Sequence, residues 1–242
     1  MSIACGITTA PRSDADYLPC TVASLRASGF DPLIFAEPGS PVDGDATTVW
    51  RQKTLGLAEN WRRSLDVLCQ LGDDAILLCQ DDVVLCRGIA EWLEGAMWPC
   101  ETTGAVSLYC PSHYANHAGG PIAIRAPDPQ NTWGACALLF PRNVAEEIVK
   151  HPIITGWTSD RGLDRCVGRV VAEMGLNFWY LTPSLAQHVG EVSSIPDYTG
   201  AAAGRRAAGD FIGEAADVRD IWPELSGTPT EPSVFREDAL KS

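Results

Sequence analysis

The sequence predicts a single α/β domain whose central sheet is mostly parallel and flanked by helices, in the manner of nucleotide-binding folds. Strand-like apolar runs alternate with segments of helical periodicity through residues 1–195. The chain has 242 residues, 45% of them hydrophobic, which is enough to bury one sizeable core. The stretch AILLCQDDVVLC, residues 75–86, also brings two carboxylates to the end of an apolar strand, where open α/β sheets bind ligands.

The first half of the chain follows this alternation. A helix over 17–27 has Pro19 in its first turn, where proline is well tolerated. Apolar residues at helical spacing predict a second helix over Leu57–Leu71, which Gly72 ends. The strands expected around these helices are Ile3–Thr8, Leu33–Ala36 and Asp74–Cys79.

The second half continues with a helix over Ile89–Met97, and with a long irregular stretch over 111–133 that is either functional or poorly ordered. After Pro141 we expect a short helix capped by Asn143, with Glu146 completing a capping box. A last helix, Asp164–Met174, ends at Gly175. The remaining expected strands are Ala105–Tyr109, Ala135–Phe140 and Asn177–Leu181.

Composition limits the classes of function. The formal charge of −13 argues against an extended nucleic-acid surface, and an anionic nucleotide would need a bound cation and placed arginines. No apolar run approaches the roughly 20 residues that span a bilayer, so we expect no membrane segment and a cytoplasmic location. The nine cysteines are scattered without a CxxC pair, which indicates reduced core residues. The fingerprints GxGxxG, GxxxxGK[ST] and GxSxG are missing, so dinucleotide enzymes, P-loop enzymes and serine hydrolases have little support.

Two positions stand out as metal ligands. Asp81 and Asp82 offer the oxygen ligands that Mg²⁺ and Mn²⁺ prefer, although aspartates also open ordinary turns. His188 follows a strand in the opposite half of the chain, in a turn with Gly190, and is either a ligand or a hydrogen-bonded core residue.

Four segments together resemble the glycosyltransferases of the GT-A fold: QDDV after an apolar strand, WGACALLF, GLDRCVG and PSLAQHVGEVSS. The resemblance covers most of residues 3–195 and implies a GT-A-like catalytic domain over 1–195. It places a divalent metal, Mn²⁺ or Mg²⁺, on Asp82 and His188, and Asp81 near the ribose or sugar. Gln80 stands where the family often has an acidic residue, which leaves open which aspartate is the ligand.

The activity that this resemblance implies is transfer of a sugar from a UDP- or GDP-linked donor to an acceptor hydroxyl. An inverting enzyme needs a general base, for which Asp164 matches the family's acidic residue, while an ordinary helix cap is the other interpretation. Asp160 is the second candidate base, or the cap of the same helix. Arg205 and Arg206 either close over the diphosphate or remain solvated.

Further donor and acceptor contacts are expected near the strand ends. Nucleotide contacts fall on Thr8, Thr9, Arg12 and Asn60, each of which could instead be a cap or a surface residue. The acceptor side falls on Trp133 and Gly134, where the glycine lets a sugar approach the backbone and the tryptophan offers a stacking face or joins the core.

Three rivals remain: a related nucleotidyltransferase, a metal-dependent phosphohydrolase and a non-catalytic nucleotide-sugar or glycan-binding module. The acceptor stays open between a glycan, a protein, a lipid, a small molecule and a modified nucleobase. We expect residues 196–225 to form a mobile Gly/Ala/Arg segment and a C-terminal helix packing on the domain, and 226–242 to be a flexible tail.

Overall fold

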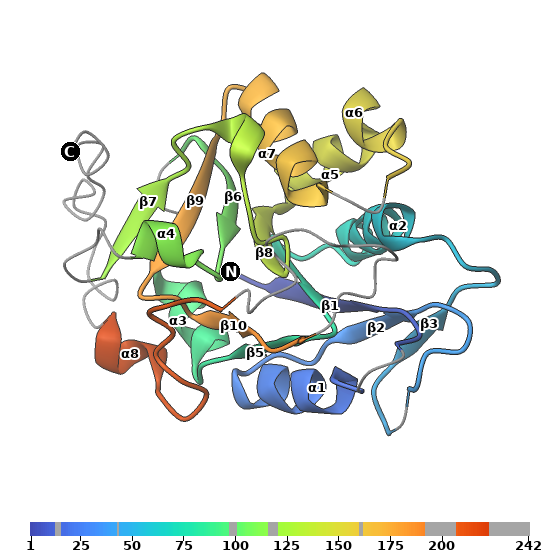
Figure 1. Cartoon of the computed structure of the whole chain (residues 1–242), viewed down its shortest axis with the longest axis horizontal. Helices are drawn as coiled ribbons and strands as arrows, with labels where there is room; N and C mark the ends of the chain where they lie inside the picture. Colours follow the sequence, from blue (N-terminus) through green and yellow to red (C-terminus); the bar gives the residue numbers. More distant parts are fainter. Residues whose placement is uncertain are drawn as a thin grey trace.

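The computed structural model describes residues 1–12, 16–42, 44–96, 101–115, 121–159, 162–191 and 207–222. Within these ranges the central sheet contains strands β1 Ile3–Thr9, β2 Leu33–Ala36, β3 Thr48–Trp50, β4 Ala75–Gln80, β6 Thr103–Ser107, β7 Ile122–Arg125, β8 Ala137–Pro141 and β9 Asn177–Thr182. Their order across the sheet is β3-β2-β1-β4-β8-β6-β9-β7 (Figure 1).

Most of this sheet is parallel. The neighbours β3–β2, β2–β1, β1–β4 and β6–β9 run in the same direction, whereas β4–β8, β8–β6 and β9–β7 are antiparallel. The α/β class with a mostly parallel sheet is therefore confirmed. A second, two-stranded sheet pairs β5 Val83–Leu85 with β10 Ala186–His188 in antiparallel fashion.

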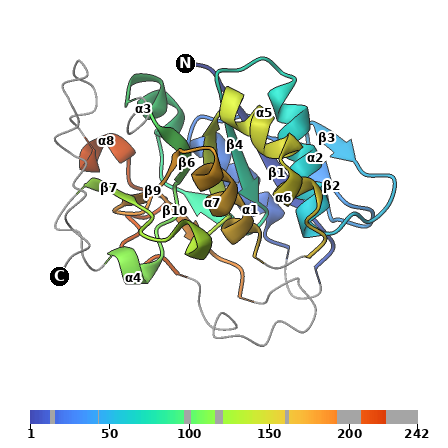
Figure 2. The same cartoon turned by 90° about the horizontal axis from the view of Figure 1, so that it is seen from above.

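Helices cover both faces of the central sheet (Figures 1 and 2). Helices α1 Leu18–Ala27 and α3 Ile89–Ala96 lie on one face together with β5 and β10. Helices α2 Leu57–Cys69, α5 Arg142–Lys150 and α7 Leu163–Glu173 lie on the other face. The shorter helices are α4 Ser112–Ala115, η1 Pro129–Asn131, α6 Pro152–Thr155 and α8 Val218–Ile221.

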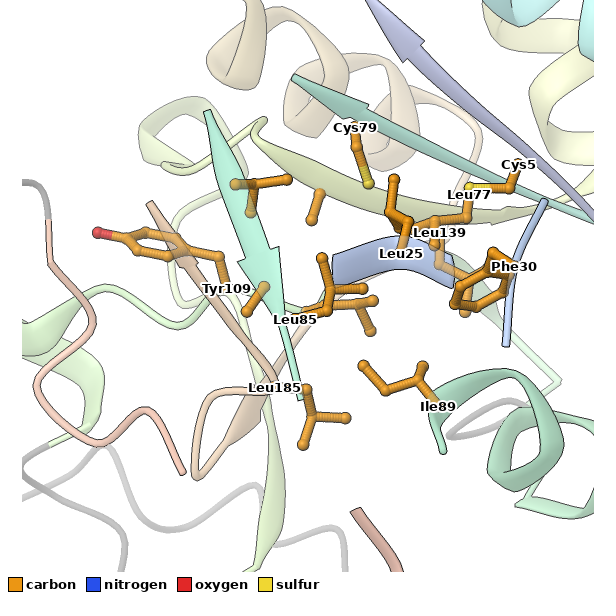
Figure 3. Close-up of a cluster of buried hydrophobic side chains, with 14 of the residues drawn as sticks. Cys5, Leu25, Phe30, Leu77, Cys79, Leu85, Ile89, Tyr109, Leu139 and Leu185 are labelled. Atoms are coloured by element: carbon orange, nitrogen blue, oxygen red, sulfur yellow. The ribbon is translucent and has the colours of Figure 1, made fainter. Parts of the chain in front are cut away.

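The core divides between the two faces because successive strand residues point to opposite sides of a sheet. In β4, Leu77 and Cys79 belong to the cluster beneath α1 and α3, and Figure 3 shows them in the same cluster as Leu25 and Ile89. Ile76 and Leu78 of the same strand belong to the cluster beneath α2, α5 and α7. A strand buried on both faces explains the continuous apolar run that precedes Asp81.

The structure corrects two expectations. The stretch over 111–133 is not irregular throughout, since it contains α4, β7 and η1; β7 is recognisable only through its pairing with β9 at the sheet edge. Asn143 does not cap α5, because Pro141 is the N-cap residue and makes no side-chain cap bond. The short strands β3, β5 and β10 were not expected either, because three residues carry too little periodicity to reveal a strand.

The last described segment, 207–222, packs against the domain. The ring of Trp222 contacts that of Trp92 edge-on at 5.7 Å between centroids, and the Trp92 indole N–H donates to the Trp222 carbonyl at 3.3 Å. Among the described helices, none has both the length and the apolar character to span a bilayer.

Candidate active site

The candidate site lies at the carboxyl end of the parallel strands. Strands β1 and β4 are neighbours whose register pairs Thr8 with Gln80, so Thr9 and Asp81 leave the sheet side by side. Strand β8 runs the other way and begins at this edge, where the Gln80 N–H donates to the Cys136 carbonyl at 2.8 Å. Residues far apart in the sequence therefore converge where such folds bind ligands.

Asp81 and Asp82 form a buried acidic pair that holds Arg12. The Arg12 Nη1 atom lies 3.1 Å from Asp81 Oδ1 and 2.9 Å from Asp82 Oδ2. Asp81 Oδ2 also accepts a 2.6 Å hydrogen bond from the Thr9 hydroxyl. The aspartates therefore do more than open a turn, and Thr9 and Arg12, two expected nucleotide contacts, belong to the same cluster.

His188 is brought to this pair by the small sheet. Strand β10 pairs with β5 so that His188 faces Val83, and the following Val189 N–H donates to the Asp82 carbonyl at 2.8 Å. His188 Nε2 lies 3.1 Å from Asp82 Oδ2. The other ring nitrogen, Nδ1, and Asp82 Oδ1 are buried without a hydrogen-bond partner among the described residues.

Burial and neighbouring charges set the ionisation of the pair. Burial and the Asp82 charge raise the pKa of Asp81 to about 6, against the lowering effect of Thr9 and Arg12. Burial also raises the pKa of Asp82, but His188 and Arg12 outweigh it and lower this pKa to about 2. Asp82 is thus the more acidic member of the pair and is ionised at neutral pH, as a metal ligand must be.

Three further residues complete the cluster. The Tyr17 ring lies beneath the Arg12 guanidinium, 4.9 Å from ring centroid to Cζ, and the Thr21 hydroxyl donates to the Asp81 carbonyl at 2.7 Å. A Cβ atom on Gly190 would clash with the Asp82 carboxylate and would lie 3.1 Å from Arg12 Nη2. Only Gly190 had a signal in the sequence, because it ends the segment that contains His188.

Asp164 is the expected base, and it lies in the first turn of α7. The N-cap of this helix is Gly162, so Asp164 is not its cap. The Asp164 Oδ2 atom instead accepts the Gly134 N–H at 3.2 Å, and Oδ1 accepts the Arg165 N–H at 3.0 Å. Burial raises the pKa of Asp164, and these hydrogen bonds offset part of that rise.

The expected acceptor residues Trp133 and Gly134 lie beside Asp164. Tyr180 fixes this segment because its hydroxyl accepts the Trp133 N–H at 2.9 Å and lies 3.2 Å from the Trp133 carbonyl. The Trp133 side chain is 37% exposed, with the Arg165 guanidinium 5.0 Å from its ring centroid. Gly134 has φ +82°, and a Cβ there would clash with Tyr109, so a side chain is strained at this position.

The segment and α7 pack closely because Gly168 lacks a side chain. The Thr132 hydroxyl donates to the Asp164 carbonyl at 2.5 Å. A Cβ on Gly168 would overlap Thr132 and approach the Pro129 carbonyl oxygen to 2.6 Å. The sequence carried no signal for Thr132, and Gly168 entered only as the last residue of the GLDRCVG segment.

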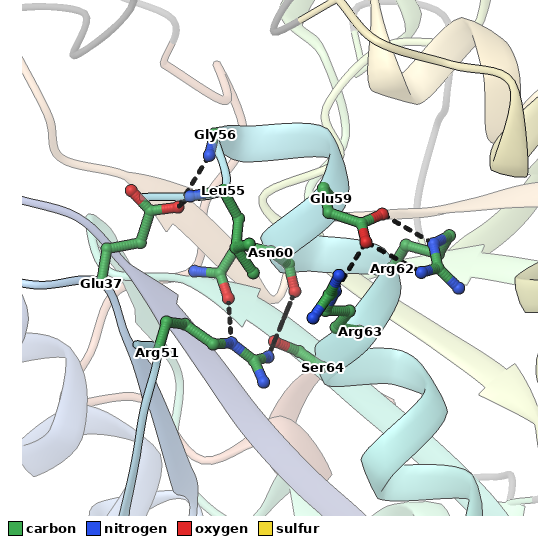
Figure 4. A network of polar contacts seen from close by, with 9 residues as sticks. All are labelled: Glu37, Arg51, Leu55, Gly56, Glu59, Asn60, Arg62, Arg63 and Ser64. Atoms are coloured by element: carbon green, nitrogen blue, oxygen red, sulfur yellow. Dashed lines mark hydrogen bonds and ion pairs between the residues drawn. The ribbon is translucent and has the colours of Figure 1, made fainter. Parts of the chain in front are cut away.

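Two expected nucleotide contacts are bonded within the fold. The Thr8 hydroxyl donates to the Cys79 carbonyl at 3.3 Å. The Asn60 amide donates to the Phe35 carbonyl at 3.2 Å and accepts from Arg51 Nε at 2.9 Å, in the network that Figure 4 shows beside the start of α2. Their proposed contacts with the donor would have to compete with these bonds.

The remaining candidates, Asp160, Arg205 and Arg206, lie outside the described residues.

Comparison with known proteins supports the fold. No protein-family model matches the chain, and no curated protein matches it in sequence. The crystal structure of GalNAc-T7 with UDP, GalNAc and Mn²⁺ is 9% identical, with a TM-score of 0.55, over 82% of this chain and 46% of that one. The chain has a GT-A-like fold.

Two further structures match this GT-A-like chain less closely in shape. The mannosyltransferase PcManGT from Pyrobaculum calidifontis, in complex with GDP-Man and Mn²⁺, is 15% identical over 73% of this chain and 53% of that one, with a TM-score of 0.48. A mannose-1-phosphate geranyltransferase from Thermus thermophilus is 10% identical over 75% and 74%, with a TM-score of 0.44. The chain spans about half the length of GalNAc-T7 and of the mannosyltransferase. At these identities the likeness concerns the fold alone.

Proposed function

We propose that the chain is a metal-dependent glycosyltransferase that moves a sugar from a UDP- or GDP-linked donor to an acceptor hydroxyl. One observation carries the proposal: Asp82 Oδ1 and His188 Nδ1 are buried without hydrogen-bond partners among the described residues, and His188 Nε2 lies 3.1 Å from Asp82 Oδ2. Buried polar atoms normally have partners, so unpaired ligand atoms indicate a missing ligand.

The residues present fit a divalent cation. Carboxylate and imidazole are accepted ligands of Mn²⁺, and Mg²⁺ and Mn²⁺ sites commonly use one or two protein carboxylates together with substrate phosphates. The described part of the chain contains no group of three or more His, Cys, Asp or Glu side chains that could hold an ion. Asp82 and His188 would therefore hold the metal jointly with the donor's diphosphate.

The chain's own residues would divide the work as follows. Asp82 and His188 hold the cation, which supplies Lewis-acid stabilisation of the departing diphosphate. Asp81 and Thr9, which share a 2.6 Å hydrogen bond, would contact the ribose or the sugar. The guanidinium of Arg12 would donate hydrogen bonds to a phosphate of the donor. Arg205 and Arg206 would bind the diphosphate in the same way.

Asp164 is proposed as the base of an inverting transfer. Its carboxylate is oriented by the Gly134 N–H at the segment that leads into β8, and β8 begins beside Gln80. The base and the acidic pair thus share one edge of the sheet. Asp164 would accept the proton of the acceptor hydroxyl, with Trp133 and Gly134 beside that acceptor.

Calorimetric titration with UDP, GDP, CDP and ADP, each with and without Mn²⁺, tests the donor site. We expect one nucleotide to bind only with Mn²⁺, and Asp82→Ala and His188→Ala to abolish that binding. Matched controls are Asp31→Ala, whose side chain is 92% exposed, and His151→Ala, whose imidazole lies 3.7 Å from Glu173 at the end of α7.

The outcomes separate the rival functions. Failure of all four nucleotides to bind would overturn the proposal. Metal-dependent binding without release of nucleoside diphosphate from UDP-glucose, UDP-N-acetylglucosamine or GDP-mannose, with a range of acceptors, would favour a binding module over an enzyme. The anomeric configuration of a product, read by NMR, would decide between inversion and retention.

A further inference from the structure

Arg12 already provides a positive charge next to the acidic pair. A metal ion that binds the same carboxylates would be repelled by it. Its side chain is 6% exposed, and one of its nitrogens contacts both carboxylates. The Tyr17 ring supports the guanidinium from one side at 4.9 Å. This arginine is therefore part of a built arrangement and not a solvated surface residue.

The two oxygens of Asp82 have different surroundings. Oδ2 lies 2.9 Å from Arg12 Nη1 and 3.1 Å from His188 Nε2, whereas Oδ1 is buried without a hydrogen-bond partner among the described residues. A divalent cation that binds Oδ1 and His188 would lie a few ångströms from a guanidinium. Repulsion between like charges is strong in buried surroundings, so Arg12 opposes the binding of a metal ion on its own.

A diphosphate changes this balance. Guanidinium groups form forked hydrogen bonds with phosphates, and a nucleoside diphosphate brings enough negative charge for a metal and an arginine together. Gly190 lies against Asp82 and Arg12 and adds no side chain between them, since a Cβ there would lie 3.1 Å from Arg12 Nη2. Arg12 can thus exchange the carboxylates for the phosphates.

We propose that Arg12 is the site's internal cation, which neutralises the acidic pair in the free chain, weakens binding of a metal ion alone and passes to the diphosphate when metal and nucleotide bind together. This inference rests on the proposed donor site. Its consequence is regulatory: the site takes up its metal with the nucleotide and not before it.

The first test titrates MnCl₂ alone, without nucleotide, into the wild type, Arg12→Gln and Arg26→Gln. Arg26 is a matched control on α1, with a 40% exposed side chain paired to Asp45 at 2.9 Å. We expect R12Q to bind Mn²⁺ at least about tenfold more tightly than the wild type, and R26Q to match the wild type. Equal Mn²⁺ affinity in R12Q and the wild type would overturn the proposal.

The second test titrates the responsive nucleoside diphosphate at saturating Mn²⁺. We expect R12Q to bind it about tenfold more weakly, because a charged donor to the phosphates is lost. Unchanged nucleotide affinity would contradict the transfer of Arg12 to the diphosphate. If the wild type itself binds no nucleotide, the proposed function fails, whereas the MnCl₂ titration still decides the role of Arg12.

A thermal measurement covers the case in which R12Q folds poorly. Loss of Arg12 leaves two carboxylates without their counter-ion, so R12Q should melt at a lower temperature, and Mn²⁺ should restore that loss. Arg12→Lys keeps the charge but not the fork, so it should bind Mn²⁺ alone like the wild type and the nucleotide more weakly. Tighter Mn²⁺ binding by R12K, or no recovery of R12Q with Mn²⁺, would refute the internal cation.

Discussion

At the scale of single residues, the site depends on close approach between groups of opposite charge. Asp82 lies between Arg12 and His188, and Gly190 covers it without a side chain. Asp164 depends in the same way on a backbone N–H of Gly134. Small changes at these positions should therefore alter binding or catalysis more than they alter the fold.

Gly190→Ala should weaken metal-dependent nucleotide binding by about tenfold, because the new methyl group clashes with the Asp82 carboxylate and with Arg12. Calorimetry with the nucleotide that binds the wild type measures this. Gly209→Ala is the control, since its added Cβ would meet Ser112 at an ordinary 3.5 Å. Equal losses in both variants would contradict a specific effect at Asp82.

Asp164→Asn should lower kcat by about 10²- to 10⁴-fold, because the amide cannot accept the acceptor's proton. Burial raises the pKa of Asp164 above its ordinary 3.8, so wild-type activity should fall as the pH drops through that raised pKa. The raised pKa also means that ionised Asp164 costs stability at neutral pH, so D164N should melt no earlier than the wild type.

Those two readouts, a pH–rate profile and a melting curve, separate a base from a structural residue. A variant that is active but unstable would show that Asp164 only supports the fold.

At the scale of elements, α7 and the segment before β8 act as one unit. Tyr180 fixes the backbone of Trp133, Thr132 bonds the Asp164 carbonyl, and Gly168 lets the two parts meet. Strands β10 and β5 do the same for His188 and Asp82. Each candidate site residue is thus positioned by a contact between two elements and not by its own element alone.

Gly168→Ala should separate η1 and Thr132 from α7, and overpacking of this kind costs about 1–3 kcal/mol. Denaturant unfolding measures the loss of stability, and kcat measures the displacement of Asp164. The neighbouring Arg169→Ala, with a 58% exposed side chain, is the control on the same helix. An unchanged midpoint in G168A would refute the close packing.

At the scale of the whole molecule, two core layers hold one sheet between them, and the segment 207–222 closes one side of it. This segment bonds to β10, where the Ala208 N–H donates to Gln187 at 2.8 Å, and to the end of β5 through Arg87 and Ala216. It is joined to both strands of the small sheet that carries His188.

Trp222→Ala should lower the free energy of unfolding by about 3 kcal/mol, because a buried ring against Trp92 is lost. Thermal and denaturant unfolding test this. Trp50→Ala, at a 52% exposed tryptophan on the edge strand β3, should change stability by no more than about 0.5 kcal/mol. A loss of unfolding free energy in Trp222→Ala no larger than that in Trp50→Ala would show that the segment 207–222 adds nothing to the stability of the fold.

The sequence alone was sufficient for the α/β class, for most of the long elements and for the acidic pair. Hydrophobic periodicity is a local property, so β1, β4, α2 and α7 could be recognised from neighbouring residues. The predicted cap at Asn143 was wrong because the first residue of a helix depends on partners distant in the sequence. The prediction of an irregular stretch over 111–133 was wrong because the pairing of a short strand depends on such partners too.

Only the tertiary structure decided how the candidate residues meet. The pairing of β10 with β5 brings His188 within 3.1 Å of Asp82, and the turn after β1 brings Arg12 to the same carboxylate. The Asp164 carboxylate accepts a hydrogen bond from the Gly134 N–H and does not cap its helix. Composition and spacing specify which groups a chain carries, whereas distances between groups far apart in the sequence arise only when its elements pack.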